Sequence, residues 1–81
     1  MSFENYIVPV SIEDGYRYDL RKTGRMVGTA MLEDGLWVAT PYEQIRDCHV
    51  KPVPEKTMTF KRLGAAEYYL LALVMDGDDY Y

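Results

Sequence analysis

Cysteine is nearly absent from this sequence, since Cys48 is the only one among 81 residues. No disulfide can form within the chain, and a small domain without disulfides is typical of a reducing cytosol, so we expect a cytoplasmic protein. Histidine is as scarce. His49 stands alone beside Cys48, and together they cannot supply the three or four ligands of a zinc site. Neighbours in an extended chain also point to opposite sides, which excludes a Cys–His nucleophile pair.

Long apolar runs and a surplus of positive charge are missing as well. The longest apolar run, residues 68–75, is far shorter than the ~20 residues of a membrane span, and no Lys- or Arg-led apolar run follows Met1. The chain shows no tag, and we expect a complete small gene product. Nine Lys and Arg against 13 Asp and Glu give a net charge of -4. Non-specific phosphate binding needs the opposite balance, whereas a basic protein partner suits this one.

Motifs for catalysis are also lacking. No glycine-rich phosphate loop followed by Lys-Ser or Lys-Thr occurs. The segment Asp76-Gly77-Asp78-Asp79 has the beginning of a calcium loop, but the chain ends at Tyr81, before the downstream ligands that such a loop requires. We therefore predict no enzyme, no metal site and no cofactor.

What the sequence does contain is a series of glycine turns. Asp14-Gly15, Thr23-Gly24 and Asp34-Gly35 separate segments rich in Tyr, Val, Met and Leu, which is a strong signal for β-hairpins. The predicted strands cover residues 5–12, 16–22, 25–32 and 36–40. Pro9 cannot donate to a ladder, so the first strand should lie at an edge of the sheet or carry a bulge at Pro9.

The loop lengths follow from which charges would be buried. Two-residue loops would place Arg17, Asp19 and Arg21 on the face of Val8 and Val10, which we expect to be the core face. Three-residue loops, 13–15 and 22–24, avoid this burial and give glycine the left-handed position of a bulged turn. The predicted core face is then Tyr6, Val8, Val10, Ile12, Tyr16, Tyr18, Leu20, Met26, Gly28, Ala30 and Leu32.

The third turn leaves two alternatives for Trp37. A two-residue loop Asp34-Gly35 places Trp37 and Ala39 on the core face, and a three-residue loop leaves Trp37 outside. We prefer the first, because a small core gains from burying tryptophan.

The remaining chain is predicted to be a loop and a helix. Three prolines indicate a loop over residues 41–58, in which 47–50 could add a short strand, and a helix follows over residues 59–76. An acidic tail, 77–81, ends the chain. The predicted fold is a single α+β domain, residues 1–81, with a four-stranded antiparallel meander (sheet 5–40) and one C-terminal helix packed on one face.

The predicted helix has more apolar residues than one sheet face can cover. Some of Tyr68, Leu71 and Met75 should stay exposed or lie under the 41–58 loop, and exposed tyrosines indicate an interface with a partner or with a second copy. The tail could dock on a basic protein. The candidate partner-binding residues are Asp76, Asp78, Asp79, Tyr80, Tyr81, Tyr68 and Trp37.

Two other functions compete with this protein-binding hypothesis. Arg17, Arg21 and Arg25 lie on the predicted outer face and second turn, where a three-stranded sheet backed by a helix could contact nucleic acid. The apolar helix could instead build a homodimer or a larger homo-oligomeric structural protein.

In size and style the whole chain, a short acidic product with a meander, one helix and no catalytic set, resembles small phage or mobile-element anti-defence proteins such as anti-CRISPR proteins. No specific motif supports this resemblance, so no functional residues are transferred. It implies stoichiometric inhibition of a host protein or protein–nucleic-acid complex, at the basic surface that binds nucleic acid.

Overall fold

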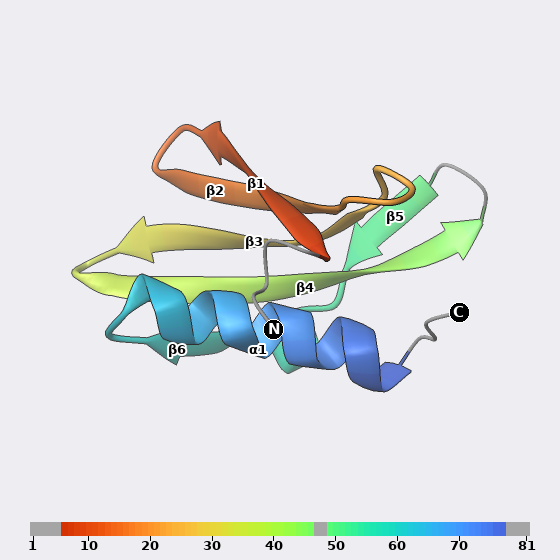
Figure 1. Cartoon of the computed structure of the whole chain (residues 1–81). Coiled ribbons are helices and arrows are strands. Elements are labelled where there is room, and N and C mark those ends of the chain that lie inside the picture. The colour runs from red at the N-terminus through yellow and green to blue at the C-terminus, as the bar shows by residue number, and fades with distance from the viewer. Residues whose placement is uncertain (1–5, 47–48, 78–81) are drawn as a thin grey trace.

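The computed structural model describes residues 6–46 and 49–77, which form an antiparallel sheet and one C-terminal helix (Figure 1). The meander order β1-β2-β3-β4 of the α+β prediction is confirmed, but the sheet has more strands than the four predicted. The elements are β1 (Ile7–Ile12), β2 (Gly15–Leu20), β3 (Met26–Glu33), β4 (Leu36–Arg46), β5 (His49–Pro52), the 3₁₀ turn η2 (Pro54–Lys56), β6 (Met58–Phe60) and α1 (Leu63–Gly77).

Strands β5 and β6 together act as one interrupted fifth strand along β4. Tyr42 of β4 pairs with Pro52 of β5, and Ala39 pairs with Met58 of β6. Three positions separate the two β4 residues, whereas six separate their partners, so η2 lies in a three-residue insertion. Pro41 lies opposite this insertion, which explains how a proline fits within β4.

The predicted loop over residues 41–58 is therefore wrong. β4 continues to Arg46, and β5, η2 and β6 fill most of the remainder. We took three prolines as breakers, but each lies where no ladder donor is needed: opposite the insertion, at the end of β5 or in η2. The helix begins at Leu63 rather than at residue 59, because β6 pairs with β4 over Met58–Phe60.

The first hairpin also differs from the prediction. Ile12 pairs with Gly15, so the loop has two residues, Glu13 and Asp14, and Asp14 rather than Gly15 has a positive φ of 65°. This shorter loop reverses the faces of β1. Val8, Val10 and Ile12 lie on the side away from α1, while Ile7 is fully buried on the helix side.

The physical reason for this error is that the face bearing Arg17 and Asp19 is not a core. No described helix packs on it, so the side chains of Arg17 and Asp19 stay 43% and 17% exposed and pair with each other, and the burial argument that excluded a two-residue loop loses its force. Tyr6, the first described residue, is 38% exposed.

The second and third turns were predicted more accurately. Tyr16 pairs with Ala30 and Tyr18 with Gly28, as the three-residue loop required. The loop itself spans four residues, 21–24, and a bulge follows it, so that Val27 rather than Met26 enters the core. In the third turn, Asp34 and Gly35 both have positive φ, which is the type I′ geometry.

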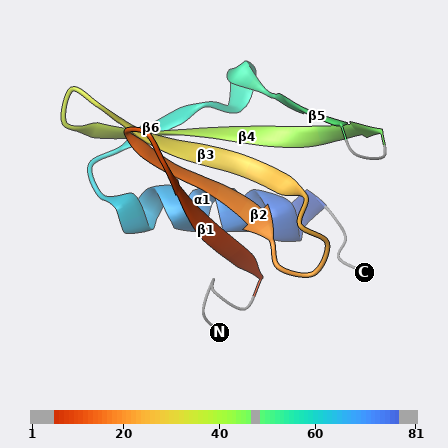
Figure 2. The ribbon, with the colours of Figure 1, turned by 90° about the horizontal axis from the view of Figure 1, so that it is seen from above.

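The third turn places Trp37 on the helix side, as we preferred. Trp37 is half-buried, and its ring centroid lies 6.3 Å from that of Tyr16. Helix α1 packs on this side against β3, β4 and β6 (Figures 1 and 2). The buried core consists of Ile7, Tyr18, Val27, Ala30, Ala39, Ala66, Leu70 and Leu71.

Pro9 and the edge strand follow the prediction. The amide of Arg21 donates to the Tyr6 carbonyl at 2.8 Å, so the even-numbered residues of β1 direct their backbone groups toward β2. Pro9 consequently faces outward, where its missing N–H costs no ladder bond and hinders pairing with a foreign strand. β1 lies at the edge of the sheet.

Candidate functional site

One face of the sheet has no described element packed on it. Its residues follow from the pairing register, because cross-strand partners share a face. The apolar members are all half-buried, and they lie on β1, β3 and β4, while β2 between β1 and β3 contributes charged residues. This surface, called the open face below, is formed by Val8, Val10, Ile12, Met26, Met31 and Val38, together with Arg17, Asp19, Thr29 and Thr40.

Among the described residues, Arg17 and Asp19 form an ion pair on the open face. Arg17 Nη2 donates to Asp19 Oδ2 at 3.2 Å, and both side chains remain partly exposed. A pair of this kind contributes little to stability, since solvent screens it. Its effect is to make the charged part of the open face locally neutral, which leaves an apolar surface of the type found at protein interfaces.

The two ends of the sheet differ in charge. The turns β1–β2 and β3–β4 lie at one end, where the Leu32 amide donates to the Asp14 carbonyl at 2.9 Å. The exposed acidic residues in these turns are Glu13, Asp14, Glu33 and Asp34. The opposite end has the β2–β3 turn and the β4–β5 hairpin, where among the described residues five cations, Arg21, Lys22, Arg25, Arg46 and Lys51, accompany one acid, Glu43.

A second uncovered surface lies on α1, on the side away from the sheet. Tyr68 is 70% exposed and Met75 is 40% exposed, and Ala65 and Ala72 beside them are also exposed. These four residues are the outward stripe. None of them is charged, and Leu71, the third residue that we expected near the surface, is buried.

A buried hydrogen bond fixes the helix that carries the outward stripe. The fully buried Tyr18 donates from its hydroxyl to Glu67 Oε2 at 2.6 Å. Burial, and then the adjacent Glu67 carboxylate, raise the pKa of the Tyr18 hydroxyl well above its ordinary value. Tyr69 adds a second tether, since its hydroxyl donates to the Lys56 carbonyl at 2.6 Å.

The raised pKa of Tyr18 predicts a loss of stability in alkali. The unfolded chain releases the Tyr18 proton above a pH of about 10, whereas the folded protein retains it, so the free energy of unfolding falls with rising pH. The slope attributable to this one group is about 1.4 kcal/mol per pH unit. Urea unfolding of wild type and of Tyr18→Phe between pH 8 and pH 11 (roughly this window) measures it.

The matched control for this experiment is Tyr68→Phe, which removes a hydroxyl that is exposed. The expected difference is a shallower alkaline slope in Tyr18→Phe alone. Equal slopes in all three proteins would contradict the assignment.

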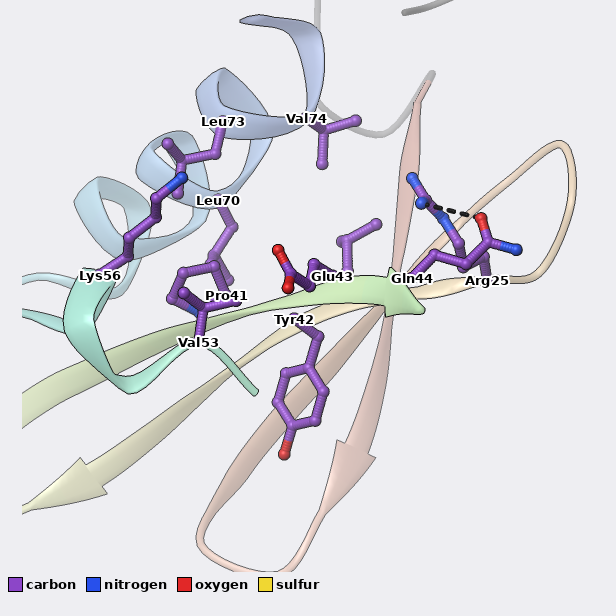
Figure 3. Close-up of a pocket in the computed structure, with 11 residues that line it drawn as sticks. Arg25, Pro41, Tyr42, Glu43, Gln44, Val53, Lys56, Leu70, Leu73 and Val74 are labelled. Carbon is purple, nitrogen blue, oxygen red and sulfur yellow. Dashed lines mark hydrogen bonds between the residues drawn. The ribbon is translucent and has the colours of Figure 1, made fainter. Parts of the chain in front are cut away.

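A cleft of about 400 Å³ lies between the second half of α1 and β4 (Figure 3). Its apolar wall includes Leu70, Leu73 and Val74, and Lys56 and Glu43 stand at its rim. Arg25 also lines the cleft, where its Nη1 donates to Gln44 Oε1 at 3.2 Å. Among the described residues no three His, Cys, Asp or Glu side chains gather to hold a metal.

Of the seven residues predicted to bind a partner, the structure describes the side chains of Tyr68 and Trp37, and these two do not share a surface. Tyr68 is exposed on the outer side of α1. Trp37 of β4 is half-buried between the sheet and the inner side of that helix. Residues 78–81 and the side chain of Asp76 lie outside the described part of the structure. The open face was missed, because Val8, Val10 and Ile12 were assigned to the core. The signal for it was present: β1 has apolar residues at both alternating positions, Ile7 as well as Val8.

The three arginines proposed for nucleic acid are also separated. Arg17 pairs with Asp19 on the open face, whereas Arg21 and Arg25 flank the β2–β3 turn at one end of the sheet. The turn arginines share that end with cations of the β4–β5 hairpin, which the sequence analysis did not include.

Comparisons with known proteins identify no relative of this chain. Searches against protein-family models, curated protein sequences and solved structures found no match to this chain. Within the described residues, no helix has both the length and the hydrophobicity to cross a membrane.

Proposed function

We propose that this protein is a non-catalytic protein-binding module whose open face docks on another protein. The observation that supports the proposal most is the uncovered face of the sheet, on which half-buried Val, Ile and Met side chains flank the Arg17–Asp19 pair, since α1 covers only the other side. Apolar side chains on a sheet face without a covering layer are typical of surfaces that become buried in a complex.

The charge distribution specifies the chemistry of the partner. The acidic turns border the open face at one end, so a complementary surface carries apolar side chains and is basic along one margin. A protein that binds nucleic acid offers such a basic margin. On the resemblance to anti-defence proteins, we extend the proposal to stoichiometric inhibition of a host complex by occupation of that surface.

Nucleic acid itself is the less favoured ligand. The net charge is -4, and Arg17, the one arginine on the open face, is engaged by Asp19. A sheet that contacted phosphates would need several unpaired cations on the contacting face.

The test compares two matched substitutions. Met31→Glu introduces a charge into the open face, whereas Met58→Glu introduces the same charge at an exposed site on the helix side of the sheet. We expect wild type and Met58→Glu to capture the same basic protein from host lysate, and Met31→Glu to lose it. Calorimetry with the purified captured protein should then show at least a tenfold weaker affinity for Met31→Glu, about 1.4 kcal/mol.

Two results would refute the proposal. One is equal affinity of the purified partner for wild type and Met31→Glu. The other is capture of nucleic acid alone, which nuclease treatment of the lysate reveals.

A further inference from the structure

The outward stripe of α1 has a pattern of side-chain sizes that complements itself. Ala65, Tyr68, Ala72 and Met75 alternate between small and large, and their spacings are three, four and three residues. This spacing is the same when the helix is followed in the opposite direction. We propose that the outward stripe pairs with the same stripe of a second copy of this chain, antiparallel, about a two-fold axis.

The antiparallel arrangement places each large side chain against a small one. Tyr68 meets Ala72 of the second copy, and Ala65 meets Met75 of that copy. The small residues allow the two helix backbones to approach closely, while Tyr68 supplies most of the buried area. A parallel pair would oppose Tyr68 with Tyr68 and leave space between the alanines.

Charge does not oppose a second copy. The stripe has no charged residue, so pairing does not bring together like charges of an acidic chain.

The area available sets the strength of the pair. Tyr68, Met75 and the small residues between them offer on the order of 400 Å² per copy, which is about half of a standard interface. We therefore expect a weak, reversible dimer with a dissociation constant on the order of 100 µM. The two open faces then point away from each other, and the dimer presents two docking surfaces.

Sedimentation equilibrium between ~10 µM and ~1 mM, a range that brackets the expected constant, measures the association. Wild type should change from monomer to dimer across this range, and Tyr68→Glu should remain monomeric, with a dissociation constant at least tenfold higher. Met31→Glu should dimerise like wild type. A wild-type monomer at every concentration overturns the proposal, as does loss of the dimer in Met31→Glu but not in Tyr68→Glu, which would place the second copy on the open face.

Disulfide trapping tests the orientation. In a Cys48→Ser background, Tyr68→Cys and Ala72→Cys proteins are mixed and oxidised. We expect the mixed 68–72 disulfide to form faster than either symmetric one. Faster formation of 68–68 and 72–72 disulfides would overturn the antiparallel arrangement. These outcomes do not depend on the proposed function, because the outward stripe and the open face are separate surfaces.

Discussion

Replacing Leu70 with alanine should lower the free energy of unfolding by about 2–5 kcal/mol. Leu70 is 1% exposed at the centre of the contact between α1 and the sheet, and its methyl groups lie against the backbone of Gly28. The removed atoms lose their burial and leave a cavity that β3 and α1 cannot close. A domain of this size has a total stability on the order of 5 kcal/mol, so the variant should be largely unfolded at 37 °C.

Leu32→Ala is the matched control, because it deletes the same atoms from a leucine that is 47% exposed at the end of β3. Its cost should stay below about 1 kcal/mol, in keeping with other partly exposed sites. Urea unfolding followed by circular dichroism measures both variants. Similar losses at the two positions would show that α1 does not pack on the sheet through Leu70.

The domain has two layers, and the outer surface of each layer is uncovered. This arrangement limits the size of the core between them. The eight buried apolar residues lie between α1 and the sheet, and the apolar residues of the open face contribute only partial burial. A partner on the open face would bury them further and would stabilise the fold by mass action. The marginal core and the proposed binding function are therefore two consequences of the same single-sided packing.

The sequence was sufficient to predict register in strands where one set of alternating residues is apolar and the other set is polar. In β2, tyrosines and charged residues alternate, and the predicted pairing of Tyr16 and Tyr18 with β3 is confirmed. The preferred two-residue loop at Asp34-Gly35, chosen because a small core gains from burying Trp37, is also confirmed. Strong patterning of this kind specifies register, because a slip of one residue would reverse every side chain.

The sequence was insufficient to predict register in the strand where both sets of alternating residues contain apolar side chains. β1 has Ile7 on one side and Val8, Val10 and Ile12 on the other, so hydrophobicity does not indicate which side faces α1. The prediction placed the three residues Val8, Val10 and Ile12 on the core face, whereas the structure buries Ile7 instead. The apolar majority forms the open face, so the misassigned register and the missed candidate site are one error.

The long hairpin of β4 with β5 and β6 was missed for a different reason. Proline is a reliable breaker only where a ladder donor is required, and the sequence does not show where the partner strand is interrupted. In the same way, Tyr68 was correctly placed among residues that could remain exposed, but the coverage of Leu71 depends on tertiary packing.

Gly15 distinguishes the two registers of the first hairpin by experiment. In the predicted three-residue loop it occupied the left-handed position, where asparagine is the best substitute for glycine. In the structure, Asp14 has the positive φ, and a Cβ on Gly15 would overlap the carbonyl oxygen of Ala30 and approach the Met31 Cα to 2.9 Å. Both neighbours are backbone atoms, which cannot rotate away.

Gly15→Ala and Gly15→Asn should therefore both lower the free energy of unfolding by roughly 3 kcal/mol, the upper range for overpacked sites. Gly24→Asn is the control, since Gly24 has a φ of +78° with open space around it, and asparagine tolerates that conformation at a cost below about 1 kcal/mol. Urea unfolding of the three variants decides between the registers. A tolerated Gly15→Asn beside a costly Gly15→Ala would restore the bulged turn, return Val8, Val10 and Ile12 to the core side, and remove the open face on which the proposed function depends.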